Sequence, residues 1–232
     1  MKPATWRQVL SSFGSPARPR IGPDGEWLWL GRQDSQLVFV RAPQSCSFVV
    51  LSPKPQPWKD WLWDATPAGV GIVAGSCPTD ASLLKLVPAL SPKRSTAVFV
   101  GDMDSFGLVQ LVEARRVLRE ANGPRLVYGG IDDVWLAAME RTLKRGRRLD
   151  SISIPLMKHE RTLLKRLDRA LDLERIVGPR SAALLRSGFK IELEGATNPH
   201  LYSDRHGRWI FEHLAARAEK SNAGARNARR GK

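Results

Sequence analysis

Short apolar segments alternate with helical segments between residues 68 and 144, and this order restricts the fold more than any other feature. The pattern predicts strands at 68–75, 96–100 and 125–130. The segments 78–90, 107–121 and 133–144 carry apolar residues at helical spacing. Strands and helices that alternate at this spacing are joined by right-handed crossovers. We therefore expect an α/β fold with a parallel sheet and flanking helices.

The segments on either side of this region predict different structure. Residues 1–24, rich in Pro, Gly and Ser, predict a flexible arm, and residues 25–66 predict a small β-rich region with strands near 26–30, 36–41 and 46–51. The α/β domain is expected to occupy 67–219 together with a helical extension, in which 189–195 alternates like a strand. The final residues, 220–232, are basic and lack large apolar side chains, so they predict a disordered tail.

The charge of the chain favours a polyanionic partner. Its 37 Lys and Arg against 23 Asp and Glu give a net charge of +14, and such an excess is typical of proteins that bind nucleic acid. No apolar run approaches the ~20 residues of a membrane span, so a membrane partner is not expected. The two cysteines supply neither a disulfide framework nor a four-cysteine zinc site. We expect a cytoplasmic protein.

Basic residues cluster after the third predicted strand. The candidate nucleic-acid contacts are Arg141, Lys144, Arg145, Arg147, Arg148, Lys158 and Lys165. A solvated helix face is the alternative explanation for the cations at 158–169. If these residues bind nucleic acid, for which DNA is the expected form, we expect contact with the phosphate backbone and little base specificity.

Carboxylates follow two of the predicted strands. Asp102 and Asp104 come after the second strand, and Asp132 and Asp133 come after the third. Ligands of parallel sheets bind outside the carboxyl ends of the strands, and crowded carboxylates are usually joined by a hard divalent cation. These four aspartates are therefore candidate metal ligands. The alternative is helix capping, by Asp104 or Ser105 for one helix and by Asp132 for the next.

The stretch "VFVGDMDSFG" resembles a known signature. A buried strand followed by D-x-D-x-x-G, here Asp102, Asp104 and Gly107, is similar to the second signature of Toprim domains. These domains occur in topoisomerases, bacterial primases, OLD-type nucleases and recombination-repair proteins. The sequence of this stretch looks most like that of topoisomerase VI A subunits and the Wadjet nuclease JetD. The resemblance covers about residues 68–145.

The resemblance implies a Toprim-like fold and a Mg²⁺ or Mn²⁺ site that handles phosphodiesters. Asp102 and Asp104 would hold the metal as catalytic residues of a nuclease in a defence or repair system, which would cleave by metal-assisted hydrolysis. The family carries a glutamate after its first strand, expected here near Ala74 or Gly75, where the sequence has none. The acids that could take its role are Glu113, Asp133, Glu192 and Glu194.

Two other interpretations remain open from the sequence. A Toprim-like domain without its glutamate can be a non-catalytic DNA-binding or assembly subunit that works with protein partner subunits. A phosphotransferase or phosphatase of another fold can also carry a D-x-D motif.

Overall fold

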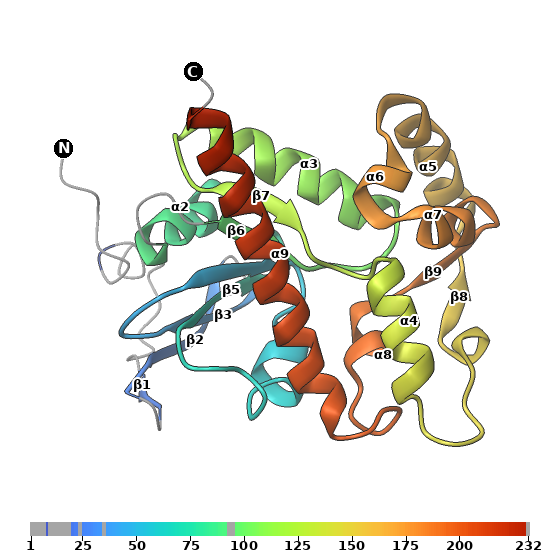
Figure 1. The fold of residues 1–232 in the computed structure, drawn as a ribbon, viewed down its shortest axis with the longest axis horizontal. Coiled ribbons are helices and arrows are strands. Elements are labelled where there is room, and N and C mark those ends of the chain that lie inside the picture. Colours follow the sequence, from blue (N-terminus) through green and yellow to red (C-terminus); the bar gives the residue numbers. More distant parts are fainter. Residues whose placement is uncertain (1–7, 9–19, 23–24, 34–35, 92–95, 231–232) are drawn as a thin grey trace.

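A seven-stranded sheet forms the centre of the molecule (Figure 1). The computed structural model describes residues 8, 20–22, 25–33, 36–91 and 96–230. The strands of this sheet are β1 (Arg20–Ile21), β2 (Trp27–Gln33), β3 (Gln36–Ala42), β4 (Phe48–Ser52), β5 (Val70–Gly75), β6 (Thr96–Phe99) and β7 (Arg125–Tyr128). Most of the expected arm at 1–24 lies outside the described residues.

The strand order is β1-β2-β3-β5-β4-β6-β7. The strands β5, β4, β6 and β7 run parallel, whereas β1, β2 and β3 add antiparallel strands along the β5 side. The α/β class with flanking helices is thus confirmed, with a mixed sheet whose helix-flanked part is parallel. The strands expected near 26–30 and 36–41 are also confirmed, as β2 and β3, which pair as an antiparallel hairpin.

The β-rich segment 25–66 shares one sheet with the strands that follow it. Its last strand, β4, lies between β5 and β6 and pairs in parallel with both. All five residues of β4 are buried, as expected for a parallel strand that is covered on both faces. The boundary expected at residue 66 therefore crosses a continuous sheet.

Helices cover both faces of the parallel strands (Figure 1). They are η1 (Pro57–Trp61), α2 (Ala81–Leu90), α3 (Ser105–Glu120), α4 (Asp133–Thr142), η2 (Leu149–Ser151), α5 (Lys158–Ala170), α6 (Leu173–Val177), α7 (Pro179–Arg186), α8 (Leu193–Thr197) and α9 (Arg205–Arg230). The helices α2 and α3 pack on one face, and α9 crosses the other together with η1, where Trp58 contacts Phe211 edge-on. No helix among the described residues combines the length and apolar character needed to cross a membrane.

The C-terminal part differs from expectation in two places. The strand expected at 189–195 is shorter, because β9 (Phe189–Ile191) pairs with β8 (Ser153–Pro155) and the chain then turns into α8. Helix α9 continues to Arg230, through a segment that we expected to be disordered. Ser221 is buried, and Asn222 Oδ1 accepts a 2.8 Å hydrogen bond from Thr96 Oγ1 of β6. These contacts extend the helix along the sheet.

Candidate functional site

The D-x-D loop joins the carboxyl end of β6 to the N-terminus of α3. Asp104 caps α3, because its Oδ1 accepts a 2.7 Å hydrogen bond from the amide of Gly107. This confirms the capping interpretation for Asp104, whose side chain is buried. A Cβ on Gly107 would lie 2.4 Å from the carbonyl oxygen of Asp102. The glycine of the signature is therefore required by the tight loop itself.

Asp102 connects the loop to two distant segments. Its Oδ1 accepts a 2.8 Å hydrogen bond from the amide of Leu193, the first residue of α8. Its Oδ2 lies 3.2 Å from Nζ of Lys54, which also lies 3.0 Å from Oε1 of Glu194. Lys54 follows β4 by two residues. The ammonium group of Lys54 thus bridges two carboxylates, one in the loop after β6 and one in α8.

A second lysine forms a similar centre beside the first. Lys190 Nζ in β9 lies 2.9 Å from Oε1 of Glu160, 3.3 Å from Oε1 of Glu192 and 3.7 Å from Oδ2 of Asp104. The amide of Met103, between the two aspartates, donates a 2.9 Å hydrogen bond to the carbonyl of Ile191. This backbone contact holds β9 against the D-x-D loop.

Burial and charge pairing set the protonation of these groups. Burial raises the pKa of Asp102 to about 6, although the amide of Leu193 and Lys54 act in the opposite direction. Burial also raises the pKa of Asp104, against the effects of the Gly107 amide and Lys190. Burial alone would lower the pKa of both lysines, but their carboxylate partners outweigh it, and the pKa of Lys190 rises to about 12. Both ammonium groups are therefore charged at neutral pH.

The two lysine centres face a shared cavity of about 510 Å³. Its charged lining consists of Lys54, Asp102, Asp104, Glu160, Lys190 and Glu194. Phe106 and Gln110 of α3 complete one wall. The cavity lies where a parallel sheet is expected to bind ligands, beyond the carboxyl ends of β4 and β6.

Asp132 and Asp133 serve helices and cations of this chain. Asp132 caps α4 by accepting from the amides of Val134 and Trp135, as the capping interpretation predicted. Its Oδ2 also pairs with Arg217 of α9. Burial alone would raise its pKa, but a nearby histidine, Arg217 and an amide outweigh burial, and the pKa is lowered.

Asp133 caps a second helix, which the sequence did not indicate. Its Oδ1 accepts a 2.8 Å hydrogen bond from the amide of Ser181, and its Oδ2 accepts a 3.1 Å bond from the amide of Arg180. Both amides belong to the first turn of α7. Gly178 precedes this turn at φ +91°, and a Cβ there would lie 2.4 Å from Cγ of Asp133. Asp102 and Asp133 each bind the N-terminal end of a C-terminal helix.

The predicted basic contacts are exposed and lie on two elements. Arg141 lies in the last turn of α4, and Lys144, Arg145, Arg147 and Arg148 follow the helix in a loop. The amide of Lys144 and its Nζ bond to the carbonyls of Leu201 and Pro199. The remaining two residues, Lys158 and Lys165, lie on the exposed side of α5.

The glutamate was expected after β5, but a different strand lies beside β6 in the structure. Ala74 is buried in β5, whose neighbours are β3 and β4, so β5 does not adjoin β6. The strand beside β6 is β4, and Lys54 follows it. Of the candidate acids, Glu192 and Glu194 belong to the lysine centres, whereas Glu113 pairs with Arg116 on α3.

Lys54, Lys190 and Glu160 were not found from the sequence. Lys54 belonged to a segment that we assigned to a separate region, and the other two lie far from the D-x-D loop along the chain. Only the preference of ligands for the carboxyl ends of parallel strands could have pointed to Lys54, once β4 was placed beside β6.

The carboxylates of the site are not arranged as a metal centre. Among the described residues, no three His, Cys, Asp or Glu side chains are placed to share one ion. The cations that Asp102 and Asp104 contact are the ammonium groups of Lys54 and Lys190. In this arrangement, ammonium groups balance the carboxylates to which the D-x-D signature assigns a magnesium ion.

No protein-family model matches the chain, and neither a curated protein nor a solved structure is similar to it.

Proposed function

We propose that the chain is a Toprim-like DNA-binding subunit that does not itself cleave DNA. The observation that carries this proposal is the position of Lys54, whose Nζ lies 3.2 Å from Asp102 and 3.0 Å from Glu194. Toprim resemblance implies a glutamate after the first strand of the parallel sheet. In this chain β4 is the first parallel strand, and a lysine follows it.

A protonated lysine at this position opposes metal-assisted hydrolysis. Its carboxylate partners raise the pKa of Lys54 against the effect of burial, so the group neither accepts a proton nor donates a lone pair to a metal at neutral pH. Its positive charge instead balances the carboxylates that a divalent cation would balance. We therefore assign no hydrolytic step to this site.

The carboxylates then have a structural role. Asp102 holds α8 and Asp104 holds α3, while Lys190 and Lys54 join these acids to Glu160, Glu192 and Glu194. The paired charges fix the C-terminal part of the chain against the sheet. The net charge of +14 supplies the attraction to DNA phosphates.

Magnesium-dependent phosphodiester hydrolysis in defence or repair is the second candidate function. The observation that favours it is the excess of carboxylates, because five acids surround two lysines in the two centres. Such an excess attracts cations. Under this alternative, Asp102 and Asp104 would bind Mg²⁺ or Mn²⁺ after Lys54 had moved away.

One experiment separates the two candidates. Supercoiled and linear DNA are incubated with the protein in Mg²⁺, in Mn²⁺ and in EDTA, and both binding and strand breaks are measured. We expect DNA binding in all three conditions, weakened by Mg²⁺ and Mn²⁺ only through their competition for phosphates, and no strand breaks. Metal-dependent nicking that Asp102→Asn abolishes would contradict the proposal and establish the nuclease.

The control for folding is Glu113→Gln. Glu113 lies outside the site and forms only an exposed ion pair with Arg116, a type of pair that contributes little stability. The variant should therefore bind DNA as the unaltered protein does. Any nicking that persists equally in Asp102→Asn and Glu113→Gln would come from a contaminating nuclease.

A further inference from the structure

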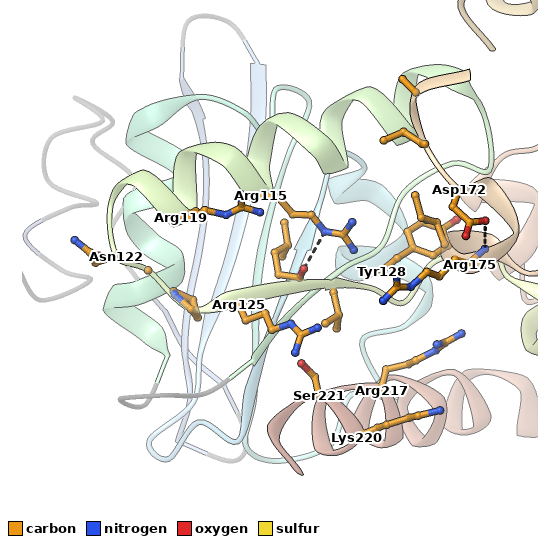
Figure 2. Close-up of a pocket in the computed structure, with 17 residues that line it drawn as sticks. Arg115, Arg119, Asn122, Arg125, Tyr128, Asp172, Arg175, Arg217, Lys220 and Ser221 are labelled. Carbon is orange, nitrogen blue, oxygen red and sulfur yellow. Dashed lines mark hydrogen bonds between the residues drawn. The ribbon is translucent and has the colours of Figure 1, made fainter. Parts of the chain in front are cut away.

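A groove of about 1080 Å³ runs along β7, the edge strand of the sheet (Figure 2). Helix α3 forms one wall and α9 forms the other, and the segment from Ala170 to Ile176 closes one end. Side chains of α3 and α9 point toward the space above β7 from opposite sides in Figure 2. The groove is separate from the cavity that the two lysine centres face, here called the acidic cavity, and it shares no lining residue with that cavity.

The lining of the groove is strongly basic. It contains six cations, Arg115, Arg119, Arg125, Arg175, Arg217 and Lys220. The acid in the lining is Asp172, whose Oδ1 accepts from the backbone amide of Arg175 and so caps α6. These cations come from α3, β7, α6 and α9, segments that are far apart in the sequence.

Two of the six cations have partners within the protein. Arg115 Nε donates a 3.0 Å hydrogen bond to the carbonyl of Leu126, and Arg217 pairs with Asp132. The other four, Arg119, Arg125, Arg175 and Lys220, are exposed and form no ion pair with any carboxylate of the described residues. They leave a surplus of positive charge in the groove.

The cations of the groove also repel one another. Burial, together with the charges of Arg125 and Arg119, lowers the pKa of Arg115. Like charges at this spacing are unfavourable until an anion joins them. Arginine supplies five of the six groups, and its planar guanidinium binds phosphate oxygens in pairs.

We propose that this groove binds the phosphate backbone of the DNA to which the proposed function refers. The groove is as large as the upper range of small-molecule sites, about 1,000 Å³, and its cations are spread over four elements. This arrangement suits a row of phosphates better than one small anion. The candidate contacts at 141–148 and on α5 are then secondary.

The test compares two triple variants that remove the same charge. The groove variant is Arg119→Gln, Arg125→Gln and Arg175→Gln, and the matched control is Arg145→Gln, Arg147→Gln and Arg148→Gln. All six side chains are exposed, so both proteins should fold, which circular dichroism checks. Binding to a duplex of about 20 base pairs is measured by fluorescence anisotropy from about 50 to 300 mM salt.

We expect the groove variant to lower the slope of log K against log salt by roughly 2 to 3, since each lost phosphate contact removes about 0.9. The control should change the slope by less than about 1. The inference would be overturned if the groove variant kept the slope of the unaltered protein and the control variant showed the lower slope. That result would leave the proposed DNA binding intact. Absence of DNA binding by the unaltered protein at about 50 mM salt would overturn both proposals.

An acidic peptide is the other polyanion that could occupy the groove. Poly-glutamate of similar length is therefore measured with the same proteins. The inference predicts that it binds more weakly than DNA and competes poorly. Poly-glutamate binding that is tighter than DNA binding and depends on the groove arginines would overturn the inference.

Discussion

Asp102 shows at the scale of one residue how burial and pairing oppose each other. Its carboxylate is buried enough for its pKa to rise to about 6, yet it holds the amide of Leu193 and the ammonium of Lys54. The group is therefore ionised and paired at neutral pH and becomes protonated in mild acid. Its ionisation is linked to the stability of the whole fold.

Asp102→Asn should change how stability depends on pH. The native pKa of about 6 exceeds the ordinary value of 3.8, so the native state binds the proton more tightly than the unfolded state. The contribution of Asp102 to stability therefore falls as pH rises from about 4 to about 6, by roughly 3 kcal/mol. The asparagine variant lacks this loss. Relative to the unaltered protein, it should gain stability across this window.

Urea unfolding of both proteins between about pH 4 and pH 7 measures this difference. Comparing the two proteins at each pH cancels the titration of groups that do not interact with Asp102, including Asp132 and Glu160, whose pKa values are lowered. A difference in unfolding free energy that stays constant across the window would contradict the raised pKa.

At the scale of elements, aspartates join the sheet to the C-terminal helices. Within each pair of acids, one caps the helix that follows, and the other binds the amide end of a helix much later in the chain. The sequence predicted the first role from position alone. It did not predict the second, because no local pattern indicates which distant helix comes to lie beside a strand end.

Asp133→Ala should loosen α7. Loss of the cap on the amides of Arg180 and Ser181 is expected to cost about 1 kcal/mol. Amide exchange in residues 179–186 should therefore speed up about fivefold, with less change elsewhere. Hydrogen exchange read by mass spectrometry or NMR measures this effect. The matched control is Asp150→Ala, because the side chain of Asp150 is 83% exposed.

Unchanged exchange in α7 of the Asp133→Ala protein would show that the cap carries no stability. Equal acceleration in the Asp150→Ala protein would show that the effect is not local to the Asp133 contact. Either result would contradict the structural role that we assign to the acid of each pair that binds a distant helix.

For the fold as well, the sequence predicted local elements but not the contacts between distant segments. Periodicity located β5, α2, β6, α3, β7 and α4 to within a few residues, because each element has a local apolar pattern. It did not indicate that β4 inserts between β5 and β6, since strand neighbours depend on packing across the whole sheet. Lys54 was missed for this reason, and Lys190 because β9 joins the D-x-D loop from the far end of the chain.

At the scale of the whole molecule, the two signs of charge are separated. Acids and two lysines gather at the carboxyl ends of β4 and β6, while unpaired cations line the groove along β7. Both lysines of the cavity pair with its carboxylates, whereas four of the six cations in the groove have no carboxylate partner among the described residues. This separation is the reason for assigning DNA binding to the groove and a structural role to the D-x-D loop.

The central claim, that Lys54 occupies the place of a metal ion, is tested most directly by Mn²⁺ binding measured by electron paramagnetic resonance. Four proteins are compared: the unaltered protein, Asp102→Asn, Lys54→Glu and Lys54→Glu combined with Asp102→Asn. We predict that the unaltered protein leaves Mn²⁺ free at about 0.1 mM, and that Lys54→Glu binds it, because the substitution replaces a cation by a carboxylate beside Asp102. The combined variant should lose this binding. Tight binding of one Mn²⁺ by the unaltered protein, abolished by Asp102→Asn, would contradict the claim.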